Sequence, residues 1–155
     1  AAIFGGGAAV ERLRNSDVFV VGAGAIGCEY LKNLALVGVG LGAKGRITVT
    51  DMDSIEVSNL SRQFLFREPH VGQNKAATAA AAIKAVFGPK LKIRALQEKV
   101  AADTAHPATG VFNKRFWAQC SVICTAVDNV AAREFLDECA AAHKKPMVDS
   151  GTQAA

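Results

Sequence analysis

Several features that mark particular classes of protein are absent from this sequence or scarce in it. No uninterrupted apolar stretch approaches the roughly 18 residues that a membrane-spanning helix needs, so we expect no membrane segment. The glycine-rich start lacks the basic and apolar segments of a signal peptide, so none is expected. Aromatic residues are only 6% and the net charge is a mild +4, with scattered lysines and arginines. A nucleic-acid surface needs clustered cations and stacking aromatics, so we expect no nucleic-acid partner.

Cysteines are also few, and their spacing fits neither a zinc site nor a disulfide framework. Cys28, Cys120, Cys124 and Cys139 form no CxxC pair and have no histidine at zinc-ligand spacing. A chain of 155 residues can also form a sizeable core without disulfides. Because cysteine is commonly a small core residue, we predict buried free thiols.

What the sequence does contain is an alternation of short β-rich runs and longer helical stretches, which predicts βαβ units. The expected strands are Val18–Val21, Arg46–Thr50, Leu91–Leu96, Ser121–Ala126 and Pro146–Val148. The expected helices are Ala25–Val37, Val71–Phe87, the short Val111–Phe116, and Ala131–Ala142, with residues 53–69 mostly irregular. The predicted fold class is therefore α/β: a Rossmann-like, mostly parallel β-sheet flanked by helices, in a single domain over residues 1–155.

A full G-x-G-x-x-G motif lies directly after the first expected strand and opens the first expected helix. Gly22 permits the tight turn, Gly24 lets a phosphate approach the backbone, and Gly27 allows the helix to pack closely on the strand. Free N–H groups near Ala25 and Ile26, at the helix start, would then face an anion. The motif predicts a nucleotide-binding turn.

Asp51 stands at the end of the second expected strand, 24 residues beyond Gly27. An acidic residue at this place in a Rossmann fold hydrogen-bonds the ribose hydroxyls of the nucleotide. On the glycine turn and Asp51 alone, an oxidoreductase that uses a nicotinamide or flavin cofactor is the obvious candidate.

The segment that follows favours a nucleotide with more phosphate. It contains Asn59 and Arg62, and Lys75 comes early in the next expected helix. Arginine offers a fork of donors and lysine a point charge, and both suit a polyphosphate. A dinucleotide's pyrophosphate is held mainly by backbone N–H groups, whereas a nucleoside triphosphate needs more cations. Other cations are interpreted as solvated surface charges: Arg67, Lys84 and Lys90.

Asp128 and Asn129 follow the fourth expected strand, at the end where open α/β sheets bind ligands. A carboxylate there suits Mg²⁺, which is held by one or two carboxylates together with phosphate oxygens. Either residue could instead be the N-cap of the next helix. The two roles are compatible if Asn129 is the cap.

Together these segments resemble the active adenylation domain of ubiquitin-activating enzymes, within the wider group of ThiF- and MoeB-like adenylyltransferases. The resemblance runs from Ile3 to Thr152 and rests on GAGAIGCE from Gly22, TDMDSIEVSNLSRQFLFR from Thr50, DNVAAR from Asp128 and the Ser-Gly-Thr that ends at Thr152. The Asn-Leu-Ser-Arg-Gln-Phe core is highly specific. The glycine-rich loop of residues 38–45 favours the enzymes for ubiquitin itself over those for related modifiers.

The resemblance implies ATP and Mg²⁺ as cofactors and assigns roles to particular residues. Asp128 would hold Mg²⁺, and Arg62, Lys75 and Asp128 would be the catalytic residues. The residues expected at the nucleotide are Gly22, Gly24, Ala25, Ile26, Gly27, Asp51, Asn59, Arg62, Gln63, Lys75, Asp128 and Asn129. In the implied reaction, the C-terminal carboxylate of ubiquitin attacks the α-phosphate and yields ubiquitin-AMP and pyrophosphate. A thioester then forms on a cysteine of a separate domain, absent from this chain.

The implied partners are ubiquitin, ubiquitin-conjugating enzymes and the inactive adenylation half of the same full-length chain, in the cytoplasm and nucleus. We therefore expect a fragment that is inactive alone. Three alternatives stay open. They are an oxidoreductase using NAD(P) or FAD, a non-catalytic interaction domain with the same fold, and an enzyme that activates a different ubiquitin-like protein.

Overall fold

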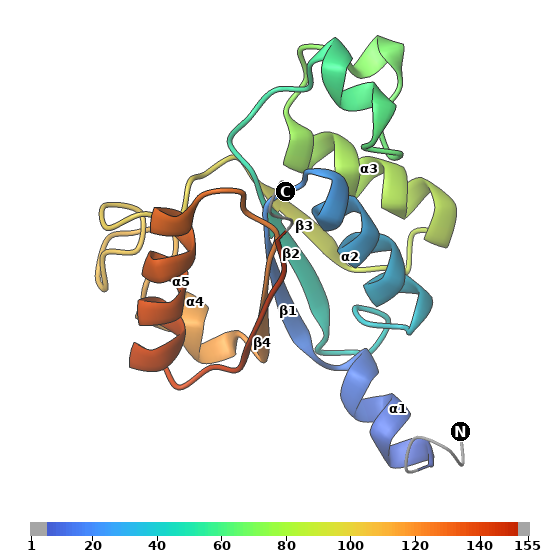
Figure 1. Cartoon of the computed structure of the whole chain (residues 1–155). Helices are drawn as coiled ribbons and strands as arrows, with labels where there is room; N and C mark the ends of the chain where they lie inside the picture. The colour runs from blue at the N-terminus through green and yellow to red at the C-terminus, as the bar shows by residue number, and fades with distance from the viewer. Residues whose placement is uncertain (1–5, 152–155) are drawn as a thin grey trace.

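The computed structural model of this chain describes residues 6–151. They form a five-stranded sheet, ordered β3-β2-β1-β4-β5, in which every neighbouring pair of strands is parallel (Figure 1). The strands are β1 (Asp17–Val21), β2 (Arg46–Thr50), β3 (Ile93–Leu96), β4 (Val122–Thr125) and β5 (Met147–Asp149). The predicted Rossmann-like α/β fold class is confirmed.

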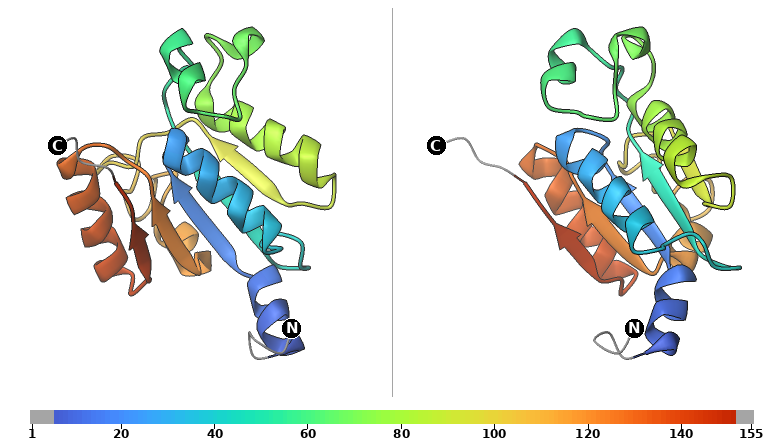
Figure 2. Two further views of the ribbon diagram at one scale, coloured as in Figure 1. Left: turned by 45° about the vertical axis from the view of Figure 1, so that its right-hand side comes forward. Right: turned by 90° about the vertical axis from the view of Figure 1, so that its right-hand side faces the viewer.

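Helices cover both faces of this sheet, with α2 and α3 on one face and α4 and α5 on the other (Figure 1). The α-helices are α1 (Gly7–Arg14), α2 (Ala25–Leu36), α3 (Lys75–Phe87), α4 (Lys114–Gln119) and α5 (Val130–Ala142), and two short 3-10 helices are η2 (Val57–Ser61) and η3 (Glu68–His70). Figure 2 shows the segment with η2 and η3 standing beyond the carboxyl ends of the strands. No helix within residues 6–151 is long and apolar enough to cross a membrane.

The central strand β1 explains why its sequence is a continuous apolar run. Successive side chains of a strand point to opposite faces, so a strand covered on both sides needs apolar residues at every position. Val18 and Val20 join the core beneath α2 and α3. Phe19 and Val21 join the core beneath α4 and α5, where the Phe19 ring meets Trp117 edge-on at 5.8 Å between ring centroids.

The strand order reverses at β1, and the position of this reversal indicates where a ligand site lies. From β1 the chain proceeds outward through β2 to β3, and then returns to form β4 on the opposite side of β1. In open α/β sheets the crevice at such a reversal, outside the carboxyl ends of the strands, is where ligands bind. Here Gly22 follows β1 and Ala126 follows β4, and the Ala126 N–H donates to the Val21 carbonyl at 2.8 Å.

For two of the helices the predicted start is wrong by three or four residues. The helix predicted from Val71 begins at Lys75, because Asn74 adopts the extended N-cap conformation and accepts a hydrogen bond from the Ala77 N–H. The short helix predicted at residues 111–116 lies at 114–119, because Asn113 caps it in the same way. In both cases a capping asparagine sets the start of the helix, and the residues before it lie outside the helix.

Smaller differences concern the remaining ends. Helix α1 was not predicted, and the segment predicted to be irregular contains η2 and η3. Strands β3 and β4 are shorter than the apolar runs that predicted them, β5 is shifted by one residue to Met147–Asp149, and α5 begins at Val130. Ile3 and Thr152, where the resemblance to adenylation domains begins and ends, lie outside the described residues.

Candidate nucleotide site

A cavity of about 650 Å³ opens at the carboxyl ends of the strands, within the size range of small-molecule sites. It lies where the turn after β1, the end of β2, the η2 segment, the start of α3 and the turn after β4 meet. All but one of the predicted nucleotide residues line it: Gly22, Gly24, Ala25, Ile26, Asp51, Asn59, Arg62, Gln63, Lys75, Asp128 and Asn129. Gly27, the exception, packs behind the turn.

The three motif glycines occupy distinct environments, as the motif predicts. Gly22 has a φ of +98°, and a Cβ there would lie 2.5 Å from the Ala126 carbonyl oxygen. A Cβ on Gly27 would lie 2.1 Å from the Gly22 carbonyl oxygen, so only glycine permits this packing of helix on turn. Gly24 is open toward the cavity, with only Gln63 Nε2 near its Cβ position, at 3.9 Å. Space for a phosphate therefore lies beside Gly24.

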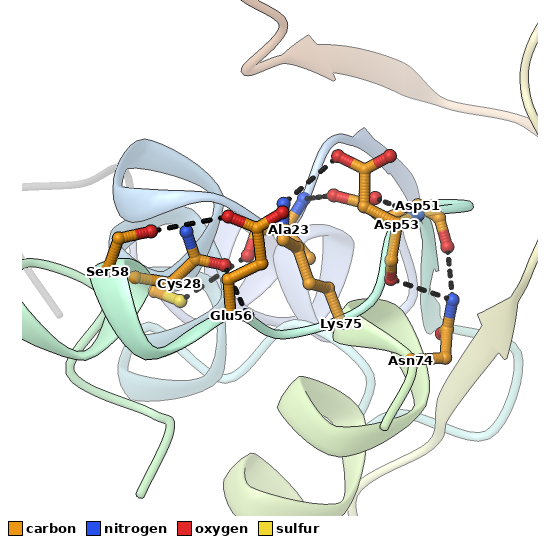
Figure 3. Close-up of polar contacts among 9 residues, drawn as sticks. Ala23, Cys28, Asp51, Asp53, Glu56, Ser58, Asn74 and Lys75 are labelled. Atoms are coloured by element: carbon orange, nitrogen blue, oxygen red, sulfur yellow. Dashed lines mark hydrogen bonds and ion pairs between the residues drawn. The ribbon is translucent and has the colours of Figure 1, made fainter. Parts of the chain in front are cut away.

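Asp51 joins the glycine turn to the end of β2. Its carboxylate accepts hydrogen bonds from the Ala23 N–H at 2.7 Å and from the Asp53 N–H at 2.9 Å (Figure 3). Burial raises the pKa of Asp51, although these N–H groups and the nearby Lys75 lower it in part. The side chain thus already orders the turn, and its lone pairs on the cavity side suit the ribose hydroxyls expected there.

Lys75 makes an ion pair that the sequence did not predict. Its Nζ lies 3.0 Å from an Asp53 carboxylate oxygen (Figure 3), with the lysine side chain 13% exposed and the aspartate 57% exposed. Asp53 also lines the cavity. The sequence carried a signal for it, since Asp53 follows the predicted ribose ligand by two residues in the same loop.

The η2 segment contributes three further predicted residues. Arg62 is exposed, and its guanidinium donates to the Ser58 carbonyl at 3.1 Å. Asn59 is buried and uses its side-chain oxygen to accept the Glu56 N–H at 3.0 Å, which closes the 3-10 turn. Gln63 is 4% exposed, and its Oε1 has no hydrogen-bond partner among residues 6–151. Gln63 thus lines the cavity and carries a buried acceptor without a partner in the described part of the chain.

The turn after β4 shows which residue caps the next helix, a question that the sequence left open between Asp128 and Asn129. Asn129 is the N-cap of α5, since its side-chain oxygen accepts the Ala132 N–H at 2.8 Å. Asp128 is exposed on the cavity wall and is not the cap. Arg133, which the sequence reasoning missed, lies one helical turn beyond Asn129 and donates twice to the Val127 carbonyl, at 3.2 and 3.3 Å. It therefore braces the turn that carries Asp128.

The acidic residues of the cavity fit Mg²⁺ carried by a nucleotide better than a metal held by protein alone. No group of three or more histidine, cysteine or acidic side chains within residues 6–151 could hold a metal ion. Asp53 and Asp128 present exposed carboxylates on the cavity, whereas both oxygens of Asp51 already accept backbone N–H groups. Mg²⁺ sites of one or two carboxylates depend on substrate phosphates for the remaining ligands.

The three cations interpreted as surface charges, Arg67, Lys84 and Lys90, all lie away from the cavity. Lys84 and Lys90 are exposed and line no part of the cavity. Arg67 is exposed as well, but it is not simply a solvated charge. Its guanidinium donates to the Phe64 carbonyl at 2.6 Å and to the Phe66 carbonyl at 2.7 Å, so it stabilises the loop between η2 and η3.

The cysteines are free, as predicted, and three of the four are buried. Burial raises the pKa of Cys28, Cys120 and Cys124 to about 11. Burial also raises the pKa of the half-buried Cys139. A nucleophilic cysteine needs a lowered pKa, so none of these thiols is prepared for catalysis.

A doubly wound parallel sheet, a glycine turn at its strand reversal and cations on the cavity wall together define a Rossmann-like nucleotide-binding domain. The model of a protein family described as "ThiF family" matches residues 1–155 of the sequence. The chain belongs to the ThiF family.

Comparison with curated proteins finds relatives that match most of the chain. The chain is 49% identical over 142 residues to "Ubiquitin-activating enzyme E1 1" of Arabidopsis thaliana, and 49% identical over 144 residues to "Ubiquitin-like modifier-activating enzyme 6" of Mus musculus. Both matches cover 92% of this chain and 13% of the relative. The chain therefore spans about an eighth of the length of these relatives.

Solved structures share the fold. The chain is similar, with a TM-score of 0.81 and 25% identity, to E. coli tRNA N6-threonylcarbamoyladenosine dehydratase, TcdA, in structures with ATP and with AMP. The match to the ATP complex covers 99% of this chain and 59% of that one, and the match to the AMP complex covers 99% and 58%.

Proposed function

We propose that this chain forms the ATP site of an enzyme that activates ubiquitin by adenylating its C-terminal carboxylate. The observation that carries the proposal is the meeting, in one cavity, of the glycine turn, Asp51, the cations Arg62 and Lys75, and Asp128. These residues come from segments far apart in the sequence. The identity of 49% to a ubiquitin-activating enzyme over most of the chain favours ubiquitin as the substrate.

In the proposed complex the backbone of the glycine turn receives the phosphates of ATP at the start of α2. Asp51 accepts hydrogen bonds from the ribose, and the unpartnered Oε1 of Gln63 accepts a hydrogen bond from the ribose or the base. Arg62 and Lys75 exchange their present partners, the Ser58 carbonyl and Asp53, for phosphate oxygens. A bond from a guanidinium to a phosphate oxygen joins two opposite charges, so it is stronger than the bond to the uncharged Ser58 carbonyl that Arg62 gives up.

The donor set fits Mg²⁺, with Asp128 as the predicted ligand and Asp53 as a second carboxylate within the same cavity. The ion, when bound, would neutralise charge on the phosphates. Asn129 fixes the start of α5 and Arg133 holds the Val127 carbonyl, so the turn that presents Asp128 is supported from both sides.

The proposed reaction joins a carboxylate oxygen of ubiquitin to the α-phosphorus as the bond to pyrophosphate breaks. A carboxylate nucleophile is already ionised at neutral pH, so the site needs no general base. Catalysis then rests on holding the two reactants together and on stabilising charge at the phosphates. Arg62 and Lys75 would stabilise the charge at the phosphates.

The later steps of the proposed pathway require parts beyond this chain. Transfer of ubiquitin to a cysteine, and then to a conjugating enzyme, needs a reactive thiol. The four cysteines here have raised pKa values and do not provide one. We place that cysteine, and the inactive adenylation half, in the remainder of a longer protein comparable to the relatives, of which this chain covers 13%.

A second candidate is activation of another ubiquitin-like protein, because one relative at 49% identity is a "Ubiquitin-like modifier-activating enzyme 6". An oxidoreductase is a weaker candidate. The glycine turn and Asp51 would serve a dinucleotide, but Arg62, Lys75 and Asp128 on the same cavity provide more charge than its pyrophosphate requires.

The test is ATP–pyrophosphate exchange by the full-length protein in the presence of ubiquitin or of other ubiquitin-like proteins. We expect exchange that depends on ubiquitin and on Mg²⁺. Lys75→Ala should lower exchange by well over tenfold, since a bond that strengthens in the transition state is worth about 2–4 kcal/mol. The matched control is Lys84→Ala, an exposed lysine on the same helix, which should leave exchange unchanged. Exchange only with another modifier, or binding of NADH in preference to ATP, would replace the proposal by the corresponding alternative.

A further inference from the structure

Asn74 links the start of α3 to the loop after β2 through a single side chain. Its Oδ1 accepts a hydrogen bond from the Ala77 N–H at 3.0 Å and thereby caps α3. Its Nδ2 donates to the Asp51 carbonyl at 2.8 Å and to the Asp53 carbonyl at 3.2 Å (Figure 3). Both ends of the amide group are therefore engaged, one with the helix and the other with the loop.

Only an amide side chain can do both tasks at this position. Serine, threonine, aspartate and asparagine all cap helices well, because each offers an oxygen to the free N–H groups of the first turn. Asparagine alone among them also carries an NH₂ group with two donors. Capping accounts for the hydrogen bond from the Ala77 N–H, but it does not account for the two hydrogen bonds to the Asp51 and Asp53 carbonyls.

The hydrogen bonds of Asn74 lie next to further contacts between Lys75 and Asp53, two residues that line the cavity. The Lys75 N–H donates to the Asp53 carbonyl at 2.9 Å, and the Lys75 Nζ lies 3.0 Å from the Asp53 carboxylate. Asn74 also forms an isolated antiparallel bridge with Ser54. The loop that carries Asp51 and the helix that carries Lys75 are thus joined at the residue immediately before the lysine.

We propose that Asn74 is a positioning residue that sets the distance between Lys75 and the end of β2. When the ribose of a nucleotide lies at Asp51, the phosphates of that nucleotide then reach Lys75. The inference rests on the proposed binding of ATP in this cavity. Asn74 itself lies outside the cavity lining and acts through Lys75.

The deciding variant is Asn74→Ser in the full-length protein, because serine keeps the cap but is too short to hold both carbonyls. We expect ATP affinity to fall about fivefold, which corresponds to about 1 kcal/mol, the contribution of one hydrogen bond. The affinity for adenosine, measured by competition against labelled ATP, should stay within about twofold, because adenosine has no phosphate for Lys75. Loss of both affinities together would mean a general structural role and would overturn the inference.

A second measurement separates action through Lys75 from any other effect. In a Lys75→Ala background, Asn74→Ser should change ATP affinity no further, since the residue on which it acts is gone. An undiminished further loss would refute the inference. The matched control is Asn113→Ser, since Asn113 caps α4 through bonds to the Arg115 and Phe116 N–H groups and makes no contact with the cavity. This control should leave both affinities unchanged.

The two proposals fail in different ways. If the wild-type protein binds no ATP, the proposed function is wrong and the role of Asn74 falls with it. If the wild type binds ATP and Asn74→Ser binds it equally well, the site stands and the positioning role is refuted.

Discussion

Replacing Gly27 by alanine should disturb both the fold and the nucleotide site, because the two meet at this residue. The added Cβ would lie 2.1 Å from the Gly22 carbonyl oxygen, where real Cβ atoms essentially never come within 3.0 Å. The turn would therefore have to move by about 0.9 Å in a closely packed interior. Such overpacking costs about 1–3 kcal/mol, and the better helix propensity of alanine returns up to about 1 kcal/mol. We expect a net loss of up to about 3 kcal/mol.

The assay combines thermal unfolding followed by circular dichroism with calorimetric titration of ATP. The displaced turn carries the backbone N–H groups proposed for the phosphates, so ATP affinity should fall at least about tenfold for Gly27→Ala. The matched control is Gly24→Ala, whose Cβ meets only Gln63 Nε2 at 3.9 Å. That methyl group points into the cavity, so it should weaken ATP binding while stability falls by less than about 1 kcal/mol, the cost of a poorer N-cap. Unchanged melting temperature and ATP affinity in Gly27→Ala would refute the reasoning.

Three further predictions concern charge and titration. Arg62→Ala should lower ATP–pyrophosphate exchange by more than about tenfold, again from the loss of about 2–4 kcal/mol at the transition state, and near-normal exchange would remove Arg62 from the site. Asp128→Asn should leave the melting temperature unchanged but raise the Mg²⁺ concentration required at fixed ATP, because Asn129 and not Asp128 caps α5. An unchanged Mg²⁺ requirement would argue against Asp128 as a ligand. At pH 8 the thiol of Cys28, with a pKa of about 11, should resist iodoacetamide, whereas the half-buried Cys139 reacts first, as peptide mass spectrometry would show. The reactivity of Cys28 should rise only as the pH approaches 11.

In this structure the two cations proposed to bind the phosphates already have partners within the protein. Lys75 pairs with Asp53 and Arg62 donates to the Ser58 carbonyl. Holding each cation near its working position lowers the entropy that must be lost when the phosphates bind. In the proposed complex ATP would displace these partners, and the exposed Asp53 would then be free to meet the proposed Mg²⁺.

Much of the site was predictable because its signals are local. The glycine turn reads directly from residues 22–27, since the backbone needs glycine both for the positive φ at Gly22 and for the close packing at Gly27. Asp51 and Asp128 could be placed because each follows a run of residues that forms a buried strand. The pairing of Lys75 with Asp53 and the hydrogen bonds from Arg133 to the Val127 carbonyl were not predicted, although Asp53 and Arg133 lie in segments that the sequence analysis quoted. The sequence does not show which side chains of distant segments meet.

The sequence by itself determined the class of fold, the glycine turn and the type of chemistry that the polar residues can perform. These follow from the periods of strands and helices and from the conformational needs of single residues, which neighbouring positions specify. The tertiary structure decided which of these residues meet. The reversal of strand order at β1 brings Asp128, from the end of β4, to the same cavity as Lys75, from the start of α3. It also decided that Asn129 caps α5, because the choice between neighbouring residues depends on how the chain enters the helix.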